Sequence, residues 1–156
     1  AQIESAIAGV DAVASVMGPV GWQSKLIFAP GYENIISAMK KHGVQRIIAL
    51  GTPTVPDEND RFNFIFWFLI VVVGFLINKG HEDLQKAGMI VRESGLDWTL
   101  VRVPLMNNES GRGNVTVGYF GNGVNWFRLS RAALVLFILA QLNNPEYFRK
   151  APAISN

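Results

Sequence analysis

The stretch Arg92-Glu-Ser-Gly-Leu-Asp-Trp-Thr-Leu-Val-Arg-Val-Pro-Leu-Met106 decides the fold class of this 156-residue chain. It predicts the end of a helix, a turn at Gly95, a buried strand from Trp98 to Val103, and a stop at Pro104. Glycine readily adopts the left-handed conformation that follows a helix, and proline lacks the N–H that would continue a strand. Ligands of open α/β sheets bind at the carboxyl ends of strands, so the loop after Val103 is a candidate site.

The alternation of helix and strand continues on both sides of this stretch. Apolar periodicity predicts helices at about 3–10, 33–42, 82–94 and 130–142, and strands at 12–17, 46–50, around 115–117 and within 147–155. Residues 20–31, with Pro30-Gly31, are expected to form a loop. Gly43 is the expected C-cap of the second helix and Ser130 the expected N-cap of the last. This order predicts an α/β fold with a parallel sheet and helices on both faces.

The composition excludes several classes of function. The chain has no cysteine and only two histidines, which excludes disulfide scaffolds, thiol catalysis and metal centres built from Cys or several His. A net charge of +2, with acidic and basic residues interleaved, gives no electrostatic basis for binding nucleic acid. The first residues form an amphipathic segment without a signal-peptide pattern, which favours a cytoplasmic protein.

Three loops that follow predicted strands carry the candidate binding residues. They are Gly18-Pro19, Gly51-Thr52-Pro53 and Pro104-Leu105-Met106. If the strands are neighbours in one parallel sheet, backbone N–H groups and the Thr52 hydroxyl at a shared edge could hold a nucleotide or a planar carbonyl compound. The alternative is that Gly and Pro only end the strands, and that the Thr52 hydroxyl bonds its own backbone.

An ordered set of motifs resembles a known family. The motifs are Gly9-Val-Asp-Ala-Val13, Asn34-Ile-Ile-Ser-Ala-Met-Lys-Lys-His-Gly-Val44, Ile47-Ile-Ala-Leu-Gly-Thr52, Arg92 to Pro104, and Ser130-Arg131. Together they resemble the NmrA-like branch of atypical short-chain dehydrogenases/reductases, which includes the biliverdin reductase B/flavin reductase type. The ending from Arg149 to Asn156 resembles fungal members.

The resemblance implies an NAD(P)-binding Rossmann domain that uses NADP or NAD and reduces a small-molecule acceptor, such as a carbonyl, flavin or tetrapyrrole-like compound. The residues that would line the nicotinamide end are Gly18, Pro19, Gly51, Pro104, Leu105 and Met106. Thr52 would orient the acceptor.

The resemblance also implies that two β-α units, with the Gly-rich diphosphate loop, should precede Ala1. Residues 1–156 are then a single C-terminal portion of such a domain. Gly118-Tyr-Phe-Gly-Asn-Gly123 does not match G-x-G-x-x-G and predicts a turn. Without the central strands, apolar faces would be uncovered, so we expect marginal stability or association.

The catalytic pair of typical short-chain dehydrogenases, Tyr-x-x-x-Lys, is absent, because no tyrosine here is followed by Lys four residues later. The family register would put the tyrosine near Gly80 or His81 and the lysine near Leu84. His81 is therefore a candidate proton donor, and the alternative is an exposed polar residue at a helix start. The missing pair keeps open a second function, that of a non-catalytic NAD(P) sensor.

The run from Phe62 to Ile77 contains sixteen residues and no charge. A bilayer-spanning helix needs about 20 residues, with about 17 as the lower limit. We therefore predict a buried helix or a homodimer interface. A membrane-associated interaction helix is the alternative, because four aromatic residues crowd one end of the run, as interfacial anchors do.

Overall fold

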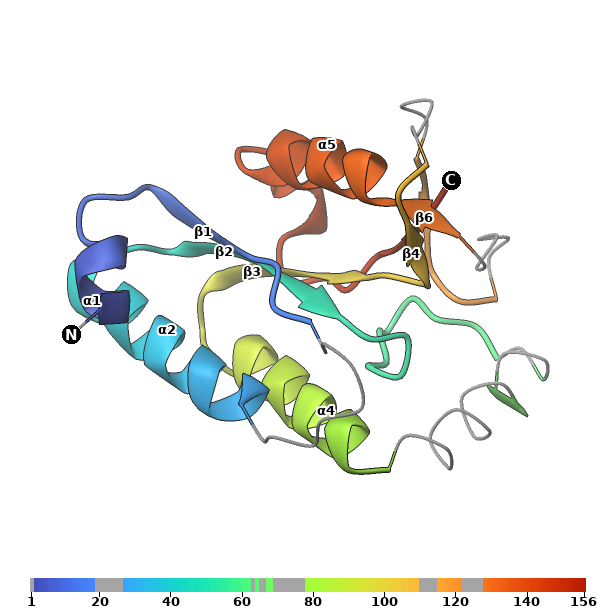
Figure 1. Cartoon of the computed structure of the whole chain (residues 1–156), viewed down its shortest axis with the longest axis horizontal. Helices are drawn as coiled ribbons and strands as arrows, with labels where there is room; N and C mark the ends of the chain where they lie inside the picture. Colours follow the sequence, from blue (N-terminus) through green and yellow to red (C-terminus); the bar gives the residue numbers. More distant parts are fainter. Residues whose placement is uncertain are drawn as a thin grey trace.

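The structure is a computed structural model that describes residues 2–18, 27–62, 64, 67–68, 78–109, 115–121 and 128–156. Helices and strands alternate along the chain, as predicted (Figure 1). In chain order they are α1 (Gln2–Ile7), β1 (Ala12–Ser15), α2 (Phe28–His42), β2 (Arg46–Gly51), α4 (Asn78–Arg92), β3 (Asp97–Arg102), β4 (Met106–Asn107), β5 (Thr116–Gly118), β6 (Leu129–Ser130), α5 (Arg131–Gln141), the 3₁₀-helix η1 (Pro145–Tyr147) and β7 (Ala153–Ser155).

A five-stranded sheet in the order β1-β2-β3-β7-β5 forms the centre of the fold. The first four strands are parallel, and β5 runs antiparallel to β7 at one side of the sheet. In the register, Ser15 lies opposite Ala49 and Gly51 lies opposite Arg102. The predicted α/β class is therefore confirmed, with one antiparallel strand added to the parallel sheet.

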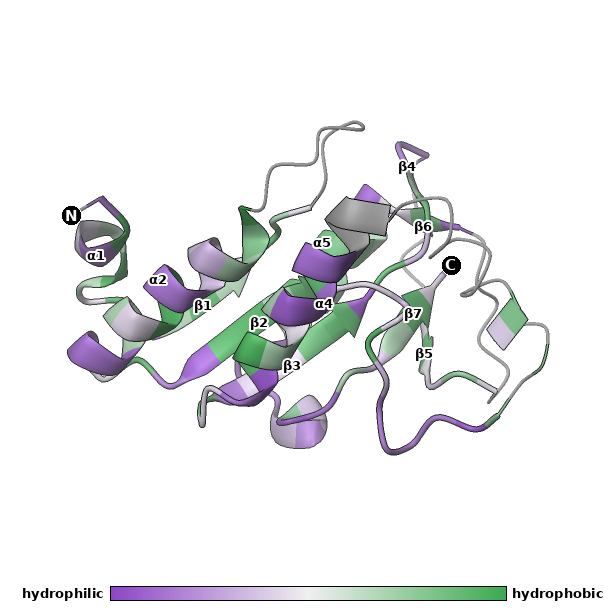
Figure 2. Ribbon diagram, turned by 90° about the horizontal axis from the view of Figure 1, so that it is seen from below, coloured by the Kyte–Doolittle hydropathy of each residue, from purple (hydrophilic) through white to green (hydrophobic). Residues whose placement is uncertain are grey.

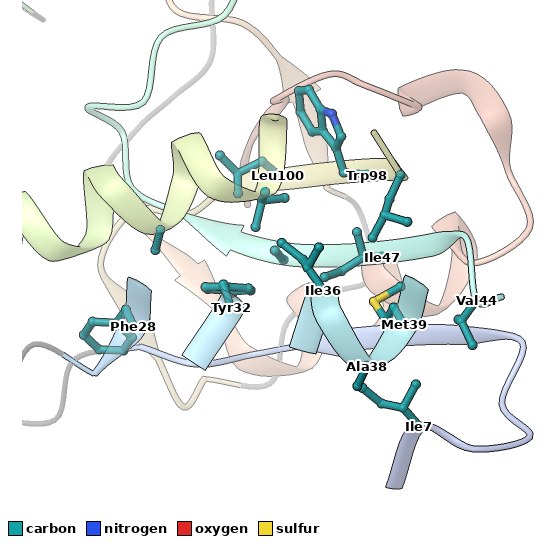
Figure 3. Close-up of a cluster of buried hydrophobic side chains, with 14 of the residues drawn as sticks. Ile7, Phe28, Tyr32, Ile36, Ala38, Met39, Val44, Ile47, Trp98 and Leu100 are labelled. Atoms are coloured by element: carbon teal, nitrogen blue, oxygen red, sulfur yellow. The ribbon is translucent and has the colours of Figure 1, made fainter. Parts of the chain in front are cut away.

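Helices cover both faces of the sheet, and each face has its own core. α2 and α4 lie on one side and α5 on the other (Figure 1). Alternate residues of each strand point to opposite faces, so Ile47 and Leu100 enter the core under α2 and α4, which Figure 3 shows. Ile48 and Val101 enter the core under α5. Hydrophobic residues are accordingly concentrated along the central strands (Figure 2).

The cap residues follow local rules. Gly43, the C-cap of α2, has a φ angle of 72°, and Gly95, in the turn between α4 and β3, has a φ angle of 76°. The Ser130 hydroxyl accepts a hydrogen bond from Ala133 N and caps α5. All three predictions are confirmed.

The expected loop over residues 20–31 was wrong at its C-terminal end, because α2 begins at Phe28 rather than near Glu33. Pro30 and Gly31 lie in the first turn, where N–H groups have no partner within the helix and proline is therefore tolerated. The N-cap residue, Ile27, makes no side-chain cap. Instead the buried carboxylate of Asp83, on α4, accepts hydrogen bonds from Phe28 N at 2.8 Å and Ala29 N at 3.2 Å.

The strand predicted as buried at 12–17 is shorter and lies at the side of the sheet. Among the described residues β1 pairs only with β2, and Ala14 and Val16 are exposed. α5 also exposes an apolar side, formed by Val135, Leu136 and Leu139. Apolar surfaces are thus uncovered, while the expected association through them remains a prediction.

Most of the uncharged run from Phe62 to Ile77 lies outside the described residues, namely 63, 65–66 and 69–77. The four aromatic residues that are described in it, Phe62, Phe64, Trp67 and Phe68, are all more than half exposed. Among the described residues no helix is long and apolar enough to cross a bilayer. Homodimer or membrane contact through this run stays a prediction.

Replacing Asp83 with Ala should destabilise the protein by about 1–2 kcal/mol, because the buried N–H groups at the start of α2 lose their only cap. The measurement is the free energy of urea unfolding. Glu82→Ala, at the exposed neighbouring position, is the matched control and should change it by less than about 0.5 kcal/mol. Equal effects of the two substitutions would contradict the capping role.

Candidate functional site

Because β1, β2 and β3 are parallel neighbours, their carboxyl ends lie on the same side of the sheet (Figure 1). Gly51 ends β2 at this edge, Pro104 follows β3 by two residues, and Gly18 follows β1 by three. Among the described residues, no atom lies within 4 Å of the position that a Cβ of Gly18 would occupy. Pro19 lies outside the described residues.

Gly51 is required by packing. A Cβ at this position would lie 2.7 Å from Leu100 Cγ, closer than side-chain contacts allow. The Gly51 carbonyl accepts a hydrogen bond from Val103 N at 3.3 Å, so this residue extends the β2–β3 ladder. From the sequence alone, a glycine required by packing at position 51 cannot be distinguished from a glycine required for contact with a cofactor.

Thr52 begins a turn directly after β2. Its carbonyl accepts a hydrogen bond from Val55 N at 3.1 Å, as in a β-turn. The Thr52 and Thr54 hydroxyl oxygens lie 2.8 Å apart, and either group can be the donor. Both residues are partly exposed. If Thr54 donates to Thr52, the Thr52 proton is free to donate to another acceptor.

Pro104, Leu105 and Met106 continue from β3 along this edge. Leu105 is 84% exposed, whereas its carbonyl accepts a hydrogen bond from Leu129 N. Met106 belongs to β4 and lies opposite Leu129 of β6. The backbone here is therefore fixed while the Leu105 side chain is free to cover a bound ring.

Sequence reasoning missed a polar network beneath this edge. The Arg102 guanidinium is fully buried and forms two hydrogen bonds to the Asp60 carboxylate, at 2.7 and 2.8 Å. Asp60 also accepts hydrogen bonds from Asp57 N and Phe120 N. The available signal was a charged residue inside an apolar strand, because such a residue needs a buried partner.

Asp57 closes the same loop against the C-terminal segment. Its carboxylate accepts hydrogen bonds from Asn59 N, Asn59 Nδ2 and Ala151 N. Burial by itself would raise the pKa of Asp57, but the hydrogen bonds from Asn59 and Ala151, with the charge of Arg102, outweigh burial and lower it. Residues 57–60 form a turn, closed by a hydrogen bond from Asp60 N to the Asp57 carbonyl, and this turn is a structural element of the site.

The tyrosines offer no replacement for the missing Tyr-x-x-x-Lys pair. Tyr32 is 2% exposed, and burial raises its pKa although Ser15 and Leu50 oppose the shift. Burial and Glu146 raise the pKa of Tyr147 to about 12. Burial and the charge of Asp57 also raise the pKa of Tyr119, the third tyrosine, although the charge of Arg102 opposes this shift. None of the three phenols releases its proton readily near neutral pH. The side chain of His81 lies outside the described residues, so its predicted role stays a prediction.

A surface recess lies beside the edge, and its interior has no room for a water molecule. It is lined by Pro53, Arg102, Val103, Pro104, Phe120, Ala153 and Ile154. Ligand pockets commonly measure about 300–1,000 Å³, so these side chains do not form a ligand-sized cavity. No group of three or more metal-ligating side chains occurs in the described part of the chain.

An open parallel sheet, helices on both faces and a ligand-accessible carboxyl edge define the class of nucleotide-binding α/β proteins. Residues 1–145 match the model of the NAD(P)H-binding family, and the chain belongs to this family. The resemblance that the sequence motifs indicated is thereby confirmed, and so is NADP or NAD as the cofactor class of the family.

Solved structures support the same fold. A short-chain dehydrogenase/reductase from Veillonella parvula has a TM-score of 0.75 and 16% identity, with 99% of this chain and 66% of that chain covered. A wide-type member from the same organism, in complex with NADP, has a TM-score of 0.74 and 15% identity, covering 99% and 67%. ChuY, an anaerobillin reductase from Escherichia coli O157:H7, has a TM-score of 0.73 and 15% identity, covering 98% and 68%. The chain thus spans about two thirds of the length of the proteins it matches.

The described residues fit the nicotinamide ring of a dinucleotide better than they fit its diphosphate. A planar ring could lie on the apolar edge between open Gly18 and exposed Leu105. A diphosphate needs free N–H groups at a helix N-terminus. At α2 these groups already bind the Asp83 carboxylate, and at α5 Ala133 N binds Ser130. Among the described residues these two helix starts therefore offer no diphosphate site.

Replacing Asp57 with Asn should weaken the acid dependence of stability. A carboxyl whose pKa is lowered by folding stabilises the folded state above its unfolded pKa, and this contribution disappears as the pH falls below that value. The ordinary pKa of Asp57 is 3.8. The wild type should therefore lose its advantage over Asp57→Asn as the pH falls through 3.8 and below, measured by urea unfolding. A stability difference independent of pH would contradict this assignment.

Proposed function

We propose that this chain forms the nicotinamide and acceptor side of an NAD(P)H-dependent reductase whose acceptor is a small carbonyl, flavin or tetrapyrrole-like compound. The observation that supports it most directly is the common edge at which β1, β2 and β3 end. Thr52 follows β2, the middle strand of the three. Gly18, after β1, has no described atom near its Cβ position, and Leu105, after β3, is exposed. Membership of the NAD(P)H-binding family supplies the cofactor class.

Each residue at the edge has a task in this proposal. The apolar edge around Gly18, Pro104 and Leu105 packs against the nicotinamide ring and excludes water from one side of it. Thr52 donates a hydrogen bond to the acceptor oxygen and orients it, with Thr54 fixing the direction of the Thr52 hydroxyl. When bound, NAD(P)H supplies a hydride from C4 of its nicotinamide.

The acceptor class is favoured by the composition of the edge. It offers a hydroxyl donor and apolar surface, while the nearby charges of Arg102 and Asp60 are paired with each other. Such an edge suits a neutral, planar, oxygen-bearing compound better than a charged one. The similarity in fold to an anaerobillin reductase agrees with this class.

A non-catalytic NAD(P) sensor is the second candidate. The missing Tyr-x-x-x-Lys pair favours it, and so do the raised pKa values of Tyr32, Tyr119 and Tyr147, because no tyrosine is activated for proton transfer as in that pair. Turnover separates the two candidates. A reductase oxidises NAD(P)H when FMN, a ketone or biliverdin is present, whereas a sensor binds the reduced cofactor without oxidising it.

Thr52→Val should lower the kcat for acceptor reduction by about 10²-fold, because the hydrogen bond to the developing oxyanion is lost. Thr52→Ser should restore most of the rate. The measurement is steady-state NADPH oxidation, with Thr116→Val as the control for an exposed threonine on β5. An unchanged kcat in Thr52→Val would refute the role of this hydroxyl.

Reduced nicotinamide mononucleotide should bind as tightly as NADPH, within about threefold (~0.6 kcal/mol), because the proposed site holds the nicotinamide ring, whereas the N–H groups at the starts of α2 and α5 are already capped. Titration of the cofactor's fluorescence measures both dissociation constants. NADPH binding more than about tenfold (~1.4 kcal/mol) tighter would contradict this fit. If neither compound bound, the proposed function itself would fall.

A further inference from the structure

We propose that the buried ion pair of Arg102 and Asp60 is a positioning device, which holds the turn that carries Thr52 against the end of β3. This inference rests on the proposed function, because it gives Thr52 its purpose. Arg102 and Asp60 touch no acceptor in this proposal; they act through the backbone of the turn.

The geometry of the pair is that of a clamp. The Arg102 side chain is 0% exposed and that of Asp60 is 20% exposed. Nη1 donates to Asp60 Oδ2 at 2.7 Å and Nη2 donates to Oδ1 at 2.8 Å, so the planar guanidinium and the planar carboxylate are fixed in two dimensions. The Phe120 ring centroid lies 4.1 Å from Cζ and covers the guanidinium.

The same guanidinium reaches the turn. Nη1 also donates to the Val55 carbonyl at 3.1 Å, and Val55 N donates to the Thr52 carbonyl at 3.1 Å. At its other end the turn joins the β2–β3 ladder, where Gly51 lies opposite Arg102 itself. The turn that carries Thr52 is therefore attached to β3 at both ends, by the ladder and by Arg102.

Asp60 extends the clamp to the rest of the loop. Its Oδ2 accepts a hydrogen bond from Asp57 N, and its Oδ1 accepts one from Phe120 N. Asp57 in turn binds Ala151 N at 2.6 Å. Asp60 therefore joins the loop to Arg102 and to Phe120, and Asp57 joins it to the segment before β7.

Stability alone does not account for a buried pair of this kind. Removing two charges from water is costly, and well-packed apolar residues often stabilise a protein as much as or more than a buried ion pair does. Arg102 Nε is buried and has no hydrogen-bond partner among the described residues, which adds to the cost. Apolar residues could not supply the hydrogen bond that Arg102 donates to the Val55 carbonyl.

The test is Arg102→Lys, which keeps the positive charge beside Asp60 but loses the two-pronged geometry and the simultaneous contact with Val55. Hydrogen exchange of the Val55 amide should become at least about tenfold faster, while amides in β2 and β3 keep their protection. The kcat for acceptor reduction should fall about tenfold with little change in KM. In a Thr52→Val background, Arg102→Lys should cause no further loss, because both substitutions remove the same interaction.

Arg128→Lys makes the same exchange at an exposed ion pair with Glu109 and should leave all these measurements unchanged. Asp60→Asn is the second variant, should Arg102→Lys fail to fold, and the same acceleration at Val55 is expected. Unchanged Val55 exchange in a folded variant would overturn the proposal, and so would a rate loss that adds fully to that of Thr52→Val. The exchange measurement needs no turnover, so a failure of the reductase function is seen separately, as absent NADPH oxidation in the wild type.

Discussion

The parallel pairing of β2 with β3 is the constraint on which the rest of the molecule depends. Its register puts Gly51 opposite Arg102. The turn after β2 therefore starts beside the last residues of β3, and Thr52 lies next to the loop that begins at Val103. The absence of a side chain at Gly51 permits this approach, because Leu100 occupies the space that a Cβ would need. A slip of one residue would turn Arg102 toward the other face of the sheet.

Buried polar groups fix the loop after β2 and the start of α2. The cores beneath α2 and α4 and beneath α5 hold the strands in place, and the loop from Thr52 to Asp60 contributes one buried side chain, Val55, to the first of them. Here the loop from Thr52 to Asp60 is held by Arg102 on one side and by Ala151 on the other. Asp83 holds the start of α2 in a comparable way. In this protein, charged side chains such as Arg102 and Asp83 connect segments that are distant in the sequence through hydrogen bonds of fixed direction.

The proposed function follows from which groups at the carboxyl edge remain available. The start of α2 is neutralised by Asp83 and that of α5 is capped by Ser130, so these helix starts are closed to a diphosphate. In the proposed function, the ends of β1, β2 and β3 receive the nicotinamide ring and the acceptor. This division agrees with a chain that spans about two thirds of the length of its NAD(P)H-binding neighbours.

The sequence by itself determined the alternation of helix and strand up to β3, the end of α2 at Gly43, the turn at Gly95 and the cap of α5 at Ser130, because these depend on neighbours within a few residues. It also identified the loops after β1, β2 and β3 as candidate binding residues. Only the tertiary structure decided that α2 starts at Phe28, that β1 lies at the side of the sheet, and that Arg102 pairs with Asp60. The groups that cause these features are far apart in the chain, 55 residues for Phe28 and Asp83 and 42 for Arg102 and Asp60. The local sequence shows that a residue such as Arg102 needs a polar partner, but only the folded structure shows which residue that partner is.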